Sequence, residues 1–289
     1  MLRHRLIFGT LMTIGFVALV LFDAWLDGSL TLEKPDSSVQ ATLLAIFLIA
    51  VTIPANLELS RLVNSGGAKI FLPVAIISTI LLSTAWYWSQ FFADRNQFAA
   101  FFFIFVVCFT LLAVFLWQGL AFAAVGAFAN CGANLLATAY LGALASFVIA
   151  VRIDFGPSAL LMYIFVVKCA DIGAYTTGRL FGRHKFSPVL SPKKTWEGMA
   201  GAVVFASVVS SIFALASGIM LLWQAILFGA SFAFIGQYGD LVESMLKRAA
   251  EQKDSSNSVP GFGGVLDVID SPLAAGVFAY LFFMFVKGF

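Results

Sequence analysis

Residues 98–121 read FAAFFFIFVVCFTLLAVFLWQGLA and contain no charged side chain. A helix needs about 20 mainly apolar residues to cross the hydrocarbon core of a bilayer. The whole chain has the same character, since 61% of its 289 residues are hydrophobic and only 11% are charged. A typical soluble domain has about a quarter charged residues. The sequence therefore predicts an all-α integral membrane protein.

About nine segments are long and apolar enough to span a membrane. The first follows basic residues, but it is long and lacks a small-residue cleavage site, so we interpret it as a retained span and not as a signal peptide. Residues 121–134 are rich in small side chains and allow a break or a re-entrant turn, which leaves eight or ten spans open. The nine segments are 5–26, 39–56, 69–91, 98–121, 132–151, 158–180, 198–216, 219–240 and 272–288.

Lysine and arginine are distributed unevenly between the two sides of this arrangement. If the N-terminus is cytoplasmic, twelve of the 17 lie on the cytoplasmic side, four lie on the other side, and Lys168 lies within a span. The positive-inside rule favours this orientation, which places the polar loops 179–197 and 241–271 in the cytoplasm. The sequence thus predicts transmembrane scaffold helices in residues 1–151 and a transmembrane catalytic region with both loops in residues 152–289.

Charged side chains are concentrated between residues 240 and 270. If the segment after Gly239 is helical, its polar residues share one face because they are three or four positions apart. Such a face offers carboxylates to a hard cation and an ammonium group to a phosphate, although a solvated face is the open alternative. The residues on this face are Asp240, Glu243, Ser244, Lys247, Glu251 and Asp254.

A glycine-rich loop, SSNSVPGFGG at 255–264, follows this face. Glycine lets the backbone approach a ligand closely, although such a sequence also makes an ordinary turn. Ser271 and Pro272 form a helix-start signal, so we expect the last span to begin there. Asp267 and Asp270 would then lie at the membrane boundary, where carboxylates suit either the helix dipole or a divalent cation.

The other polar loop, 179–197, is basic and contains a second helix-start signal at Ser191 and Pro192. One interpretation is that Lys193, Lys194 and the helix end bind phosphates. The other is the ordinary excess of positive charge beside a membrane.

Two charged residues, Lys168 and Asp171, lie three positions apart inside the predicted span 158–180. They form either an ion pair that lowers the cost of burial or a polar site that faces an internal cavity.

A long spaced motif runs from the charged face through the glycine-rich loop. Its residues are Ser244, Leu246, Lys247, Arg248, Lys253, Asp254, Ser256, Val259, Pro260, Gly263, Gly264, Asp267, Ile269 and Asp270. This motif resembles the signature of phosphatidate cytidylyltransferases, also called CDP-diacylglycerol synthases. Further family motifs are similar to Asp171, Ala174, Tyr175, Gly178, Gly182, Ser191, Pro192, Lys193, Lys194, Thr195, Glu197 and Gly198. The resemblance covers residues 165–275, and it extends to the first half of the chain only as a hydrophobic pattern.

The resemblance implies an enzyme of phospholipid biosynthesis that converts CTP and phosphatidic acid into CDP-diacylglycerol and pyrophosphate. It implies Mg²⁺ as the cofactor, with a second cation such as K⁺ left open. It also implies a homodimer among membrane lipids, in the bacterial inner membrane, with a cytoplasmic active site and no nucleic-acid partner.

The same resemblance suggests roles for individual residues. Asp240 and Asp267 would bind the metal. The catalytic group would be Asp171, Lys194, Ser244, Lys247, Arg248 and Asp270. Residues that bind substrate would be Tyr175, Ser191, Lys193, Thr195, Lys253, Gly263 and Gly264.

The chain departs from the family pattern at two positions, with Phe262 where the family has histidine and Val268 where it has arginine. Both changes remove a polar contact, so either the substrate or loop geometry differs, or the protein is a catalytically impaired relative. Two other functions remain open. One is a CTP-dependent transferase that acts on another lipid, and the other is a transporter whose path includes Lys168 and Asp171.

Overall fold

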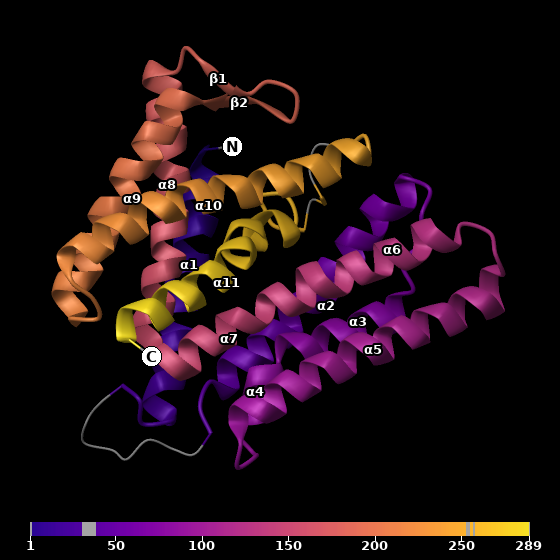
Figure 1. Ribbon diagram of the computed structural model, residues 1–289. Coiled ribbons are helices and arrows are strands. Elements are labelled where there is room, and N and C mark those ends of the chain that lie inside the picture. The colour runs from indigo at the N-terminus through magenta and orange to yellow at the C-terminus, as the bar shows by residue number, and fades with distance from the viewer. Residues whose placement is uncertain (1, 31–38, 253–254, 257, 289) are drawn as a thin grey trace. The chain divides into compact units, whose positions relative to one another are not determined.

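The computed structural model describes residues 2–30, 39–252, 255–256 and 258–288 and divides into two compact units (Figure 1). Unit 1 combines Met1–Ile153 with Ala249–Val268, and unit 2 combines Asp154–Arg248 with Ile269–Phe289. Eight helices in the described part of the chain are long and apolar enough to cross a membrane. The predicted fold class is therefore confirmed, and the chain is an all-α integral membrane protein.

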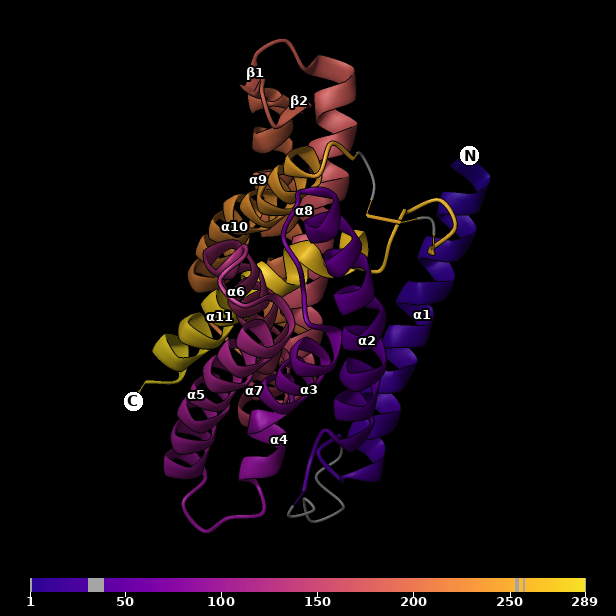
Figure 2. The ribbon, with the colours of Figure 1, turned by 90° about the vertical axis from the view of Figure 1, so that its right-hand side faces the viewer.

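Unit 1 is built from the first seven α-helices and one π-helical segment. Helix α1 packs on α2, and α3 packs on α2, α5 and the π-helical segment (Figures 1 and 2). The segments are α1 (Leu2–Leu26), α2 (Thr42–Ser65), α3 (Leu72–Ser83), α4 (Ala85–Ser89), α5 (Arg95–Phe122), α6 (Ala127–Ala137), η1 (Thr138–Ala143) and α7 (Leu144–Phe155).

The number of spans differs from the expected nine because residues 69–91 do not form one long helix. Helix α3 ends at Ser83, and only the short α4 follows. Near this break the Ser83 and Thr84 hydroxyls both donate to the carbonyl of Ile80, and such side-chain bonds compete with the helix ladder. By contrast, residues 127–155 make one span that begins after a turn at Gly126, whose φ is 66°.

A buried charge cluster links α7 to the first two helices of unit 1. Arg152 is fully buried, and its Nη2 lies 2.8 Å from Asp27 Oδ2 and 3.6 Å from Asp23 Oδ2. The two carboxylates also accept the backbone N–H groups of Ala41 and Leu43 at the start of α2. A single guanidinium therefore pairs with both acidic residues, which in turn bind the start of α2.

We predict that Arg152→Met lowers the free energy of unfolding by about 3–5 kcal/mol, because it leaves two buried carboxylates without their cation. Unfolding of the purified protein in detergent micelles measures this loss. Arg61→Met is the control, since Arg61 is an exposed arginine in the same unit. Equal stability of the two variants would contradict the structural role of Arg152.

Unit 2 contains four helices and one antiparallel hairpin. Helices α8 and α9 pack closely because glycines line their contact. A Cβ atom on Gly173 would lie 2.7 Å from the Gly201 carbonyl oxygen, and one on Gly201 would lie 2.0 Å from Thr177 Oγ1. The elements are α8 (Pro157–Phe181), β1 (Lys185–Ser187), β2 (Ser191–Thr195), α9 (Trp196–Ser217), α10 (Leu222–Ala249) and α11 (Leu266–Lys287), with the first residues of α11 in unit 1.

The predicted helix start at Ser191 and Pro192 is wrong. These residues belong to β2, which pairs with β1 through Ser187↔Ser191 and Lys185↔Thr195. Helix α9 begins at Trp196, and Thr195 caps it by accepting a hydrogen bond from the N–H of Gly198 at 3.1 Å. Proline suits an edge strand as well as a first helical turn, so the signal was ambiguous.

The predicted start of the last helix at Ser271 and Pro272 is also wrong. Helix α11 begins at Leu266, and Pro272 lies inside it. The predicted helical face after Gly239 is confirmed as far as Ala249, where α10 ends. Glu251 lies beyond the helix with a φ of 56°, and Asp254 lies outside the described residues.

Candidate active site

The carboxylate of Asp240 is central to a polar cluster in unit 2. Its Oδ2 lies 3.1 Å from Lys194 Nζ, which also donates to the backbone carbonyl of Gln237 at 3.1 Å. Its Oδ1 accepts a hydrogen bond from Ser271 Oγ at 2.6 Å. Strand β2 supplies the lysine, α10 supplies the carboxylate, and α11 supplies the hydroxyl, so three elements meet at one acidic side chain.

A second carboxylate, Asp171 of α8, joins this cluster through Gln237. The Gln237 side chain donates to Asp171 Oδ1 at 3.0 Å, and Lys168 Nζ lies 3.8 Å from Asp171 Oδ2. The predicted Lys168–Asp171 ion pair is therefore present and partly exposed, whereas a cavity facing these residues stays a prediction. Gln237 was missed from the sequence, although it is a polar residue in a predicted span one turn before Asp240.

A third carboxylate, Asp270 of α11, is buried beside Ser271. Its Oδ1 accepts the Ser271 N–H at 2.7 Å and lies 3.1 Å from Ser271 Oγ. Because a hydroxyl has one proton and Asp240 is nearer, Ser271 donates to Asp240 and separates the two carboxylates. The sequence suggested Ser271 as a helix cap, whereas the structure gives it this bridging position.

The cluster carries more negative than positive charge. It contains the carboxylates of Asp171, Asp240 and Asp270 and the ammonium groups of Lys168 and Lys194, and these groups interact electrostatically. Ionisable groups inside membrane-spanning segments are costly unless they are paired or face a ligand. The excess negative charge therefore suits a bound cation, and the two lysines suit phosphate oxygens.

Mg²⁺ in proteins is usually held by one or two carboxylates, with water and substrate phosphates completing its coordination. Asp240 and Asp270 flank the same hydroxyl and are two carboxylates of the kind that such a site uses. Within the described ranges, no group of three or more His, Cys, Asp or Glu side chains could hold a metal ion.

The other predicted residues of α10 lie on the turns after Asp240. Ser244 is partly buried, and Arg248 is exposed. Lys247 is mostly buried and its Nζ lies 2.5 Å from Glu243 Oε2, within the same helix. Lys247 therefore already has one anionic neighbour, and Glu243 fixes the direction of its side chain.

The predicted substrate-binding residues of unit 2 occupy α8 and the hairpin. Tyr175 is exposed, and its hydroxyl accepts from Arg179 at 3.1 Å. Ser191 and the exposed Lys193 lie on β2, and Thr195 is the cap of α9. The predicted residue Lys253 lies outside the described residues.

Asp267 and the glycine-rich loop belong to unit 1. We call Ser255, Ser256 and residues 258–266 the signature loop. Asp267 Oδ2 accepts from Gly264 N at 2.7 Å, Ser255 N at 3.1 Å and Ser255 Oγ at 2.5 Å. These three hydrogen bonds tie Asp267 to its own loop, and its role as a metal ligand stays a prediction.

Both predicted glycines are required by the shape of the signature loop. Gly263 has a φ of 108°, which non-glycine residues rarely adopt. A Cβ atom on Gly264 would lie 2.0 Å from Ser255 Oγ and 2.4 Å from Glu58 Oε2. The glycines therefore allow the loop to fold tightly around two carboxylates.

The two departures from the family pattern also lie in this part of unit 1. The ring of Phe262 lies against Gly9 of α1, where an added Cβ atom would be 3.0 Å from the ring. Val268 is partly buried in the first turn of α11. Phe262 thus packs the signature loop on a membrane helix, a contact that suits an aromatic side chain.

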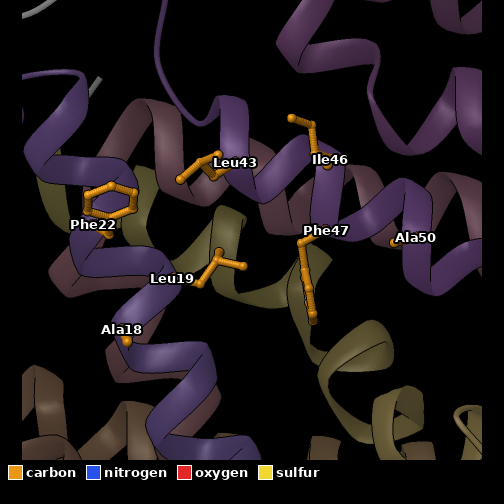
Figure 3. Close-up of a pocket in the computed structure, with 7 residues that line it drawn as sticks. All are labelled: Ala18, Leu19, Phe22, Leu43, Ile46, Phe47 and Ala50. Carbon is orange, nitrogen blue, oxygen red and sulfur yellow. The ribbon is translucent and has the colours of Figure 1, made fainter.

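A separate hollow in unit 1 does not suit a polar substrate. It has a volume of about 470 Å³ and lies between α1 and α2 (Figure 3). Its lining is apolar throughout and consists of Ala18, Leu19, Phe22, Leu43, Ile46, Phe47 and Ala50. The hollow offers no side chain that could bind a phosphate or a metal.

Comparison with known proteins identifies the family of this chain. The model of the cytidylyltransferase family matches residues 3–286. A phosphatidate cytidylyltransferase from Staphylococcus haemolyticus is 33% identical over 225 residues, which are 78% of this chain and 81% of the relative. Two others align over shorter stretches. That from Haemophilus influenzae is 44% identical over 133 residues (44% of this chain, 46% of the relative), and that from Bacillus subtilis is 39% identical over 156 residues (53% and 58%).

In those two alignments the chain spans about half the length of the relatives. The family match is nonetheless nearly complete, and the alignment with the Staphylococcus haemolyticus protein covers most of both chains. The chain therefore belongs to the cytidylyltransferase family, as a relative of the bacterial phosphatidate cytidylyltransferases.

Proposed function

We propose that this protein is a phosphatidate cytidylyltransferase, which transfers the cytidylyl group of CTP to phosphatidic acid and releases pyrophosphate. The observation that carries the proposal is the cluster around Asp240, in which Lys194 and Ser271 contact opposite oxygens of one carboxylate. The names of the relatives supply the reaction, and the charges of the cluster suit its anionic substrates.

The reaction needs positioning more than proton transfer. The phosphate of phosphatidic acid is anionic near neutral pH, so its oxygen attacks the α-phosphorus of CTP directly. One P–O bond forms there, the bond to the β-phosphate oxygen breaks, and pyrophosphate leaves with its electron pair. Holding two polyanions together and neutralising the transition state are therefore the main tasks of the protein.

The cations of unit 2 are suited to these tasks. Lys194 is held by Asp240 and a backbone carbonyl, so its ammonium group is oriented before substrate arrives. Lys193 is exposed on the same strand, and Lys247 and Arg248 lie further along α10. We assign these four groups to the phosphates of CTP and lipid, and Ser244 to a nearby hydrogen bond.

Mg²⁺ is the proposed cofactor, with K⁺ as the candidate for a second cation. Asp240 would hold Mg²⁺ together with Asp270 or Asp267, and the bound ion would neutralise charge on the transferring and leaving phosphate groups. Asp171, one step away through Gln237, would adjust the charge of this site.

The proposal includes a location and an assembly. The polar loops 179–197 and 241–271 hold eight of the 17 lysine and arginine residues. The positive-inside rule favours a cytoplasmic location for such loops, so we assign the active site to the cytoplasmic face of the bacterial inner membrane. Residues 1–151 would serve mainly as transmembrane scaffold for the catalytic region 152–289, and the protein would act as a homodimer.

An assay with purified protein in detergent tests this function. Radiolabelled CTP, phosphatidic acid and Mg²⁺ are expected to yield a lipid-soluble cytidine product that is lost when EDTA removes the metal. Diacylglycerol, which lacks the phosphate, should give no product. Absence of lipid-linked cytidine under conditions in which a relative is active would refute the proposal, and product only with a polyprenol or archaeol phosphate would show that another lipid is the substrate.

A further inference from the structure

Glu58 is a buried acidic residue in the C-terminal half of the membrane helix α2. It lies on α2, which is long and apolar enough to span a membrane, and is only 2% exposed. Placing a carboxylate in such surroundings is costly unless its charge is compensated. The groups that donate hydrogen bonds to this carboxylate therefore indicate its role.

Hydrogen bonds from the signature loop compensate the Glu58 carboxylate. Oε1 accepts from Val265 N at 3.0 Å and from Ser256 Oγ at 2.6 Å. Oε2 accepts from Leu266 N at 2.9 Å and lies 3.2 Å from Ser255 Oγ, whose single proton goes to the nearer Asp267. Three N–H or O–H donors are thus directed at the carboxylate, so a metal ion at these oxygens would face their hydrogens.

Two of these donors belong to the start of α11. The first N–H groups of a helix have no partner within the helix, and the positive end of the helix dipole lies there. Leu266 is the first residue of α11, and Val265 precedes it. Glu58 therefore caps α11 from a different helix, which explains why α11 begins well before the expected Ser271.

The same contacts connect Glu58 to Asp267. The hydroxyl of Ser255 lies 2.5 Å from Asp267 Oδ2 and 3.2 Å from Glu58 Oε2. Gly264 donates its N–H to Asp267, and its Cα leaves no room for a side chain between the two carboxylates. Asp267 is thus held by loop atoms that Glu58 holds in turn.

Two weaker contacts fix the ends of this arrangement on unit 1. Phe262 lies against Gly9 of α1, and Ser65 Oγ at the end of α2 lies 3.3 Å from the Ala250 carbonyl oxygen. The yellow-orange loop before α11 accordingly lies beside α1 (Figure 2). Among the residues described, Glu58 is the charged anchor of the loop.

We propose that Glu58 is a positioning residue, which sets the signature loop and thereby the Asp267 carboxylate for the cytidylyl transfer. This inference rests on the proposed function. It also gives a membrane helix of the first half of the chain, expected to be scaffold, a direct part in shaping the site.

Glu58→Gln tests the inference because glutamine keeps the shape of the side chain and removes its charge. One acceptor oxygen becomes a donor that faces N–H and O–H groups, so one or two of the three hydrogen bonds are lost. Hydrogen exchange of peptides that cover residues 258–267 is expected to become about tenfold faster. The kcat for CDP-lipid formation is expected to fall about 100-fold, with a higher Mg²⁺ concentration for half-maximal rate.

Asn56→Ala is the matched control. Asn56 is equally buried on α2, but its amide donates to Thr52 and to Thr79 of α3 and has no contact with the signature loop. The Asn56→Ala variant should be less stable than the wild type, with the same loop exchange and the same Mg²⁺ requirement. If the role of Glu58 were purely structural, Glu58→Gln and Asn56→Ala would be alike in loop exchange and in Mg²⁺ requirement.

Loop exchange in Glu58→Gln that equals the wild-type rate would overturn the inference, and so would an unchanged Mg²⁺ requirement when the wild type is active. Hydrogen exchange needs no substrate, so it tests the loop contact even if the wild type is inactive. In that case, faster exchange in Glu58→Gln would support the loop contact, and the missing activity would refute only the proposed reaction.

Discussion

Asp240→Asn is expected to reduce the rate of CDP-lipid formation about 100- to 1,000-fold. The carboxylate orients Lys194 through Oδ2 and accepts the Ser271 hydroxyl through Oδ1. Asparagine is nearly the same size, but its neutral amide no longer balances the lysine and is a poor ligand for Mg²⁺. The initial rate with radiolabelled CTP and saturating Mg²⁺ measures the loss.

Asp154→Asn is the control for this experiment. Asp154 is another carboxylate of unit 2, and its Oδ2 accepts a hydrogen bond from Tyr280 at 2.9 Å. We expect this variant to retain nearly full activity. If Asp240→Asn were as active as Asp154→Asn, then the cluster around Asp240 would not be the active site.

A pair of substitutions at Asp267 is expected to separate its charge from its hydrogen bonds. In Asp267→Asn, the amide oxygen can still accept from Gly264 and Ser255, so the signature loop should stay closed while turnover falls about 100-fold or more. In Asp267→Ala, all three hydrogen bonds are lost, so turnover should fall at least as far and the loop should also open.

Hydrogen exchange of the loop, measured beside the rate, distinguishes these two results. Protected loop amides in an inactive Asp267→Asn variant would support a role for the carboxylate charge, as in metal binding. Full activity of Asp267→Asn would remove the metal assignment and leave Asp267 as a structural residue of the loop. Asp270, which shares the Ser271 hydroxyl with Asp240, would then be the second carboxylate for Mg²⁺.

The sequence predicted the membrane fold and most of the Asp240 cluster because both depend on strong local signals. Long apolar runs determine the spans, and charged residues in such runs are rare enough to be noticed. Asp171 was selected as a charge inside a predicted span, Lys194 from the basic loop 179–197 and Asp240 from the charged face after Gly239. The structure brings the three together. Gln237 was not selected because a single neutral amide in a span carries little signal.

Element boundaries were less predictable where tertiary contacts compete with local preference. Pro272 is a residue that favours the first turn of a helix, so local preference predicts a start there. The carboxylates of Glu58 and Asp267 accept the N–H groups of Leu266 and Gly264, and α11 therefore begins earlier, at Leu266. Pairing with β1 similarly places Ser191 in a strand. Glu58 is 208 positions from Leu266, so no window around the start of α11 contains this cause.

Glu58 was missed for a related reason. It lies just beyond the predicted span 39–56, where one acidic residue resembles an ordinary interfacial charge. Its partners, Ser255, Ser256, Val265 and Leu266, are about 200 positions later in the chain. Only the fold shows that the charge is buried and that the signature loop surrounds it.

The most direct test of the proposed reaction follows the phosphorus atoms of CTP. Purified protein is given phosphatidic acid, Mg²⁺ and CTP labelled with ³²P at either the α or the γ position, and the lipid is extracted. Cytidylyl transfer predicts that the α label enters the lipid and that the γ label is recovered in pyrophosphate. Transfer of the γ label to lipid, or no transfer of either label by an intact protein, would contradict this function.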